Sequence, residues 1–129
     1  MGQKVSPIGF RLVKRKRWDS NWYANKKEFG QLLAEDRKIR QVLNKKSTLS
    51  GSSKIIIKRT SGKVEITIHT ARPGLVIGKK GSEIDALKAE LSKLTGREVW
   101  VEVQEIKRPD TNAKLVADNI AKQLSRRLP

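Results

Sequence analysis

The sequence contains no cysteine, which excludes disulfide bonds, thiolate zinc sites and cysteine nucleophiles. It also has no apolar run that approaches the roughly 18 residues needed to cross a bilayer. The N-terminus lacks the apolar stretch of a secretory signal. We therefore expect a protein of the cytoplasm, or of an equivalent organelle matrix, with no membrane partner.

Histidine and clustered carboxylates are scarce as well. His69 is the only histidine, and the 13 acidic residues are scattered between lysines rather than grouped as a metal site requires. A lyase or nuclease acting on nucleic acid is the rival interpretation, but it needs a catalytic constellation that the sequence does not offer. We expect no enzyme activity, no metal, no cofactor and no small-molecule substrate.

Positive charge is what the sequence has in excess. Its 29 Lys and Arg against 13 Asp and Glu give a formal charge of +16, which repels itself unless an acidic partner lies nearby. No strongly amphipathic basic helix with exposed aromatics points to a membrane surface, so nucleic acid is the expected partner.

The first 17 residues form the most basic segment and contain no acidic residue. Apolar residues interleave with the charges, which favours an arm that orders against a partner over a free solvated tail. We expect Trp18 and Trp22 to staple this arm to the domain rather than to stack on bases. The basic residues of the arm are Lys4, Arg11, Lys14, Arg15, Lys16 and Arg17.

Apolar spacing predicts an α+β fold of two layers, a three-stranded sheet packed on helices. Helical spacing begins near Lys26. Phe29, Leu32 and Leu33 share one face and Ile39, Val42 and Leu43 share another, which fits one bent helix or two short ones. A loop over 47–53 follows. Strands are predicted at 54–58, 64–68 and 98–103, the first two joined by a hairpin turn at Ser61 and Gly62.

The second half of the sequence predicts three helical segments. Pro73 opens a short turn that ends at Ile77. Ser82 and Asp85 form a capping-box pattern before a helix that ends at Gly96. A last helix opens at 109–111. The sheet is expected to bury Val64, Ile66, Ile68, Val99, Val101 and Val103 under helices that carry Ile84, Leu87, Leu91 and Ile120.

The loop Gly78-Lys79-Lys80-Gly81 lies between two predicted helices. Its two glycines let a phosphate backbone approach the main chain, and the second helix presents free N–H groups and the positive end of its dipole there. The pattern G-x-x-G alone is weak, because many basic surface turns match it. Its position between a hairpin and a third strand favours a nucleic-acid contact over a solvated turn.

Residues 74–81, Gly-Leu-Val-Ile-Gly-Lys-Lys-Gly, resemble the K-homology (KH) signature V-I-G-x-x-G. The hairpin ahead of the paired helices resembles the second type of KH domain, and KH domains clamp about four nucleotides of backbone with this loop. Residues 1–9, 68–74 and 110–117 also resemble the family of the KH-bearing protein three of the bacterial small ribosomal subunit, so that the resemblance runs the whole length of the chain.

The resemblance implies a structural constituent of the small ribosomal subunit that binds ribosomal RNA beside neighbouring ribosomal proteins, with messenger RNA as a further contact. A free-standing RNA-binding chaperone or regulator is the alternative, since such a protein would have the same charge, loop and fold as a ribosomal one. The expected parts are an arm with the first helix at 1–38, a KH domain at 39–107 and a C-terminal helix at 108–129. The expected RNA-binding residues are Gly78, Lys79, Lys80, Gly81, Arg72 and the six basic residues of the arm.

One departure from that family concerns the end of the chain. The family usually continues past a position like Arg126-Arg127 into a second α+β domain, and its contribution to unwinding messenger RNA rests largely on basic residues of that portion. We therefore expect either an N-terminal fragment or an unusually short member, and we do not assign unwinding to this chain.

Overall fold

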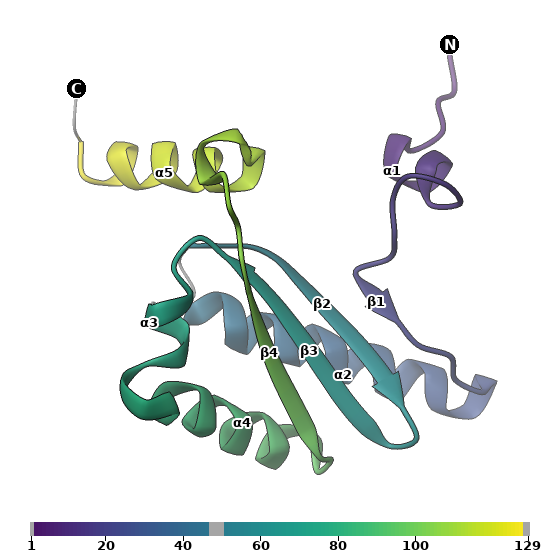
Figure 1. The fold of residues 1–129 in the computed structure, drawn as a ribbon. Helices are drawn as coiled ribbons and strands as arrows, with labels where there is room; N and C mark the ends of the chain where they lie inside the picture. Colours follow the sequence, from purple (N-terminus) through teal and green to yellow (C-terminus); the bar gives the residue numbers. More distant parts are fainter. Residues whose placement is uncertain (1, 47–50, 128–129) are drawn as a thin grey trace.

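The structure is a computed structural model in which residues 2–46 and 51–127 are described. The helices and strands follow one another along the chain as Figure 1 shows, with η marking a 3-10 turn. They are α1 (Pro7–Arg11), β1 (Ser20–Asn21), α2 (Lys26–Lys45), β2 (Ser52–Thr60), β3 (Lys63–Thr70), α3 (Pro73–Ile77), η2 (Lys79–Gly81), α4 (Ser82–Thr95), β4 (Val99–Glu105), η3 (Pro109–Thr111) and α5 (Ala113–Ser125).

The sheet has four strands in the order β1-β2-β3-β4. β2 and β3 form the antiparallel hairpin, and Ser61 and Gly62 both adopt the positive φ that a type I′ turn requires. β4 pairs in parallel with β3 because α3 and α4 carry the chain back between them. The three predicted strands are confirmed. The fourth, β1, has only two residues and is too short to show a periodicity.

The loop predicted over 47–53 is wrong at its end. Ser52 and Ser53 already belong to β2, which pairs with the last residues of β3. Residues 47–50 lie outside the described part of the chain.

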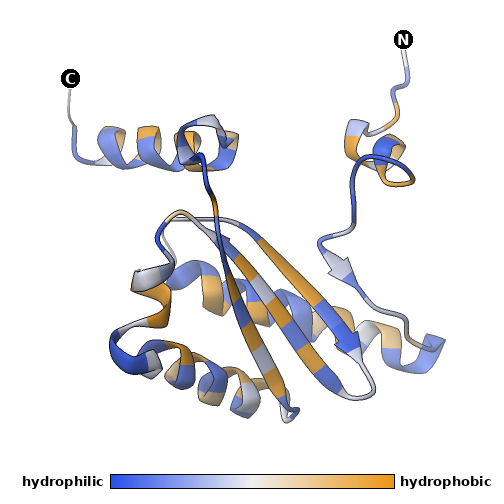
Figure 2. Cartoon of the chain, in the orientation of Figure 1, coloured by the Kyte–Doolittle hydropathy of each residue, from blue (hydrophilic) through white to orange (hydrophobic). Residues whose placement is uncertain are grey.

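The core lies between one face of the sheet and the helices α2 and α4 (Figure 1). Hydrophobic and hydrophilic residues alternate along β3 and β4 in Figure 2, as expected where one face is covered, whereas β2 has a continuous hydrophobic run at Ile55, Ile56 and Ile57. The predicted core is confirmed for Val64, Ile66, Ile68, Val99, Val101, Leu87 and Leu91. Val103 and Ile84 are partly buried against it.

Ile120 is not part of this core, and that prediction is wrong. Its side chain is 53% exposed. The reason is visible in Figure 1, where α5 lies beyond the end of the sheet instead of across its covered face. Along the described residues, α5 contains no buried side chain.

The helix predicted from residue 26 is a single helix, α2, of 20 residues. Its buried stripe follows the spacing of an amphipathic helix, with intervals of four, three and four residues. The stripe consists of Leu32, Asp36, Ile39 and Leu43. The predicted face of Phe29, Leu32 and Leu33 is therefore wrong except at Leu32, because Phe29 and Leu33 are half exposed. The second predicted face is confirmed, since Ile39 and Leu43 are fully buried and Val42 packs against the core.

Asp36 joins three segments of the chain. Its carboxylate accepts a hydrogen bond of 2.7 Å from the indole Nε1 of Trp22 and one of 2.6 Å from Nη2 of Arg59 on β2. The Trp22 ring also lies 5.3 Å from the ring of Phe29. Trp22 thus acts as the predicted staple, whereas Trp18 is 63% exposed and does not.

Helix ends follow the sequence only in part. Gly96 ends α4 in the left-handed conformation, as predicted, with φ 67°. The capping box at Ser82 is wrong, because Ser82 is the first residue of α4 and no side chain caps this end. Asn112 caps α5 by accepting a hydrogen bond from the Leu115 amide.

None of the helices in the described residues is long and apolar enough to span a membrane.

Candidate nucleic-acid interface

The turn between α3 and α4 begins at a residue that only glycine can occupy. Gly78 has φ 73° and ψ −171°, a region of backbone space that side chains exclude. A Cβ atom built there would lie 2.4 Å from Cγ and 2.8 Å from Cβ of Glu83 in the first turn of α4. Gly78 therefore allows the loop to fold closely onto α4.

The loop continues through two left-handed residues, Lys80 with φ 52° and Gly81 with φ 76°. Glycine adopts this conformation without cost, but a lysine pays about 1–2 kcal/mol. A Cβ atom at Gly81 would meet only Ile84, at 3.8 Å, so this glycine is needed for its backbone angle rather than for space. Strain at Lys80 is typical of a position maintained for function.

The charges around the loop do not all favour an anion. Lys79 and Lys80 are exposed, and no carboxylate of the described residues pairs with either. The uncapped start of α4 presents backbone N–H groups and the positive end of a 14-residue helix dipole. Glu83 and Asp85 in the same turn oppose an anion, so the two lysines have to supply the excess positive charge.

Apolar side chains beside the loop were not predicted as part of the site. Leu75 and Ile77 are 52% and 39% exposed, although they belong to the short apolar helix α3. Leu75 lines a shallow depression with Lys79 and Ser82. A helix of five residues gives too few positions for the sequence to reveal which side chains face outward.

Trp100 offers an aromatic surface on the edge strand β4. Its side chain is 54% exposed, and Nζ of Lys88 on α4 lies 5.4 Å from the ring centroid. Trp100 faces away from Val99 and Val101, the buried valines on either side of it in the strand. Exposed aromatic rings next to cations are surfaces on which bases can stack.

Arg72 lies at the other end of α3 from the Gly78–Gly81 loop. Its backbone amide donates to Oγ1 of Thr70, and the residue precedes the first helical position, Pro73. Its neighbours in a hollow of the surface include Asp118 and Lys122 of α5. Arg72 is therefore placed between the loop and the C-terminal helix.

The basic arm contains a short helix that its sequence does not predict. Residues 7–11 form the short helix α1, which begins after Ser6 and contains Pro7 at its first position. The guanidinium of Arg11 donates to the carbonyl of Pro7. Most apolar residues of the arm face solvent, with exposed fractions of 63–91% at Val5, Ile8, Phe10 and Val13, and Leu12 is partly buried.

The arm and the loop occupy different sides of the molecule. Figure 1 shows α1 beyond the β1 edge of the sheet, whereas α3 and α4 connect β3 to β4 at the opposite edge. Three basic residues of the arm line a hollow, and they are Lys14, Lys16 and Arg17. Trp18 and Lys58 of β2 line it too, and Lys58 was not among the predicted RNA-binding residues. Lys4 and Arg15 are exposed. The predicted RNA-binding residues therefore form separate groups.

A metal centre is not visible among the described residues, since no three His, Asp or Glu side chains there are grouped to hold an ion. The surface consists instead of cations, backbone donors and a few exposed apolar and aromatic side chains. This is the chemistry that contacts a sugar–phosphate backbone.

Comparison with known proteins adds three relatives and one family model. The KH domain model matches residues 38–111. Small ribosomal subunit protein uS3 of Protochlamydia amoebophila is 70% identical over the whole chain, which covers 60% of that protein. The proteins of the same name from Chlamydia trachomatis serovar A and Chlamydia caviae are 62% and 65% identical over 99% and 94% of the chain. The chain spans 57% and 54% of their respective lengths.

Proposed function

Because this chain belongs to the KH domain family, we propose that it binds RNA backbone through the Gly78–Gly81 loop as a structural, non-catalytic part of the small ribosomal subunit. The single observation that carries the proposal is the geometry of the loop. Gly78, which must be glycine, and the left-handed Lys80 determine the path of the loop. This path places the side chains of Lys79 and Lys80, which have no ion-pair partner among the described residues, at the start of α4.

The ribosome as the location is supported by the relatives, each of which is named as a small ribosomal subunit protein and matches nearly all of this chain. Ribosomal RNA and neighbouring ribosomal proteins are the partners that follow from this location. We include messenger RNA as a further contact. In a bacterium, the protein would then work in the cytoplasm.

The proposed division of labour follows the charge distribution. The KH domain, at 39–107, holds the RNA at the loop, and the arm, within 1–38, adds affinity without sequence preference because its lysines and arginines meet phosphates rather than base edges. Arg72 extends the loop site toward the C-terminal helix at 108–129. The first of these boundaries falls inside α2, so it separates functions and not folding units.

Charge reversal at the loop tests the RNA contact. We expect Lys79→Asp with Lys80→Asp to leave the melting temperature nearly unchanged, since exposed substitutions cost about 0.5 kcal/mol or less. The slope of log affinity against log salt for single-stranded RNA should flatten by about 1.4, at roughly 0.7 per lost phosphate contact. Lys27→Asp with Lys93→Asp, two exposed lysines elsewhere, is the charge-matched control. Equal slopes for the two double variants would refute the loop as the site.

Sedimentation of a lysate on a sucrose gradient tests the location. A structural constituent travels with the small subunit. A free-standing RNA-binding chaperone or regulator stays near the top. That result would refute the location in the small subunit but not the RNA contact of the loop.

A further inference from the structure

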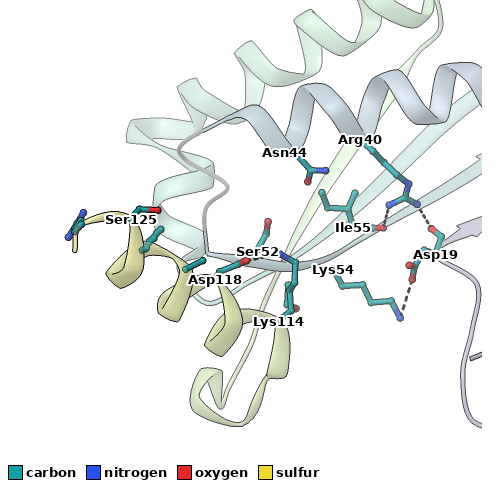
Figure 3. Close-up of a pocket in the computed structure, with 13 residues that line it drawn as sticks. Asp19, Arg40, Asn44, Ser52, Lys54, Ile55, Lys114, Asp118 and Ser125 are labelled. Carbon is teal, nitrogen blue, oxygen red and sulfur yellow. Dashed lines mark hydrogen bonds and ion pairs between the residues drawn. The ribbon is translucent and has the colours of Figure 1, made fainter. Parts of the chain in front are cut away.

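A second basic cleft lies between α5 and the beginning of β2, where the C-terminal half of α2 also contributes to the wall (Figure 3). Its volume is about 650 Å³. Five cationic side chains line it, and two carboxylates, leaving a net charge of +3. The cations are Arg40, Lys54, Lys114, Lys122 and Arg126.

Arg40 builds the wall of this cleft. Its guanidinium donates to the carbonyl of Ile55 at 2.8 Å and to the carbonyl of Asp19 at 3.1 Å, and it also bonds the Ser20 hydroxyl. These bonds, two of which are drawn in Figure 3, tie α2 to β2 and to β1. The guanidinium of Arg40 is thus occupied by these structural hydrogen bonds, and it stabilises the wall of the cleft that faces α5.

The remaining cations differ in the ion pairs that they form. Nζ of Lys114 lies 2.7 Å from the Asp118 carboxylate, whereas Nζ of Lys54 lies 3.7 Å from that of Asp19. Within the described residues, the side chains of Lys122 and Arg126 form no hydrogen bond or ion pair. Lys122 is in the last turn of α5 and Arg126 is the C-cap of that helix, four residues on, a spacing at which like charges repel each other. An anion between them would relieve that repulsion.

We propose that this cleft is a second RNA site, which holds sugar–phosphate backbone between Lys54 of β2 and the C-terminal end of α5, where Lys122 and the C-cap residue Arg126 lie. The choice of ligand rests on the RNA-binding role proposed above, but the site uses no residue of the Gly78–Gly81 loop. Hydroxyl and amide groups of Ser53, Ser125 and Asn44 also line the cleft and can donate to phosphate and ribose oxygens.

An acidic peptide fits the cleft less well than RNA. Peptide docking depends on a few apolar or aromatic anchors that fill pockets. Ile55 and Ala121 are the only apolar residues that line the cleft, and the larger apolar residues of α5, Ile120 and Leu124, do not line it. Cations and hydrogen-bond donors without apolar pockets are what backbone recognition requires.

The cleft adjoins a second hollow that lies nearer to the Gly78–Gly81 loop and shares part of its lining. Asp118 and Lys122 also line the neighbouring hollow that contains Arg72. Arg72 precedes α3, and the Gly78–Gly81 loop follows the far end of that helix. The hollow thus connects the cleft to the start of α3, but Asp110 and Asp118 balance the charges of Arg72 and Lys122 in its lining. The excess positive charge is in the cleft itself.

The test measures binding of the whole chain to a single-stranded RNA at several salt concentrations. Lys122→Gln with Arg126→Gln should flatten the log–log salt slope by about 1.4, which corresponds to about 25-fold weaker binding at 0.1 M salt. The control, Lys27→Gln with Lys93→Gln, removes the same charge from exposed positions outside the cleft and should retain the slope. Circular dichroism melting confirms that both variants fold.

Combining the cleft variant with Lys79→Asp and Lys80→Asp separates the two sites. Independent sites give additive losses in log affinity. The cleft proposal is overturned if the cleft variant and its control behave alike, or if the cleft variant loses binding only to polyglutamate. If the cleft variant loses RNA affinity while the loop variant does not, the proposed RNA contact of the loop is refuted and the proposed RNA site in the cleft is supported.

Discussion

The KH core and the two terminal helices differ in what they bury. Ile39, Leu43 and Leu91 in the core are fully buried, whereas neither α1 nor α5 buries a side chain among the described residues. Phe10 and Leu124, at the two ends, are 74% and 70% exposed. Isolated helices of 5 and 13 residues are marginal in water. The core can therefore fold on its own contacts, and the terminal helices depend on capping and on what they bind.

Truncation within α4 should show the largest effect. Leu91→Ala removes a fully buried side chain and should lower the free energy of unfolding by about 2–5 kcal/mol. Leu94→Ala in the same helix is the control, because Leu94 is 42% exposed and should lose far less. Urea denaturation of both variants measures the difference. Equal losses would contradict the packing of α4 described above.

Removal of the buried carboxylate should come next. Asp36→Ala leaves Arg59 buried without its shortest ion pair and should cost about 3 kcal/mol, the low end for such pairs, because Glu35 still contacts Arg59 at 3.0 Å. Trp22 loses its acceptor too, so its fluorescence should change along with the stability. Glu35→Ala should be milder, since that side chain is 25% exposed.

A methyl group at the loop should have an intermediate effect on stability. Gly78→Ala forces a Cβ atom against Glu83 in a backbone conformation reserved for glycine, at a cost of about 1–3 kcal/mol. Gly74→Ala is the matched control, because nothing lies within 4 Å of its added Cβ and its φ is not positive. Thermal melting compares them. A Gly78→Ala variant as stable as the Gly74 control would mean that the loop is not held against α4.

The smallest effect is expected on the terminal helix. Ile120→Ala shortens a half-exposed side chain and should change the free energy of unfolding by about 0.5 kcal/mol or less. Alanine also has the higher helix propensity, which offsets part of any loss. Urea denaturation measures it. A loss like that of Leu91→Ala would show that α5 belongs to the core.

Local patterns in the sequence were sufficient for most of the elements. Alternation at Val64, Ile66 and Ile68 identified β3 and its buried face, and Gly96 marked the end of α4. Cations and glycines at 78–81 identified the loop itself. These predictions succeed because the side-chain period of a strand or helix, and the backbone freedom of glycine, are properties of neighbouring residues.

Other features depend on which elements meet, and here only the tertiary structure decided. Asp36 reads as a solvated acid but is buried, because Arg59 and Trp22 reach it from 23 and 14 residues away. Ile120 has helical spacing like Leu91, but α5 lies past the end of the sheet and leaves it exposed. The separation of the arm from the loop, and the cleft beside α5, also follow from strand order and helix placement. Periodicity encodes which face of an element is apolar, while the packing of distant segments determines what covers that face.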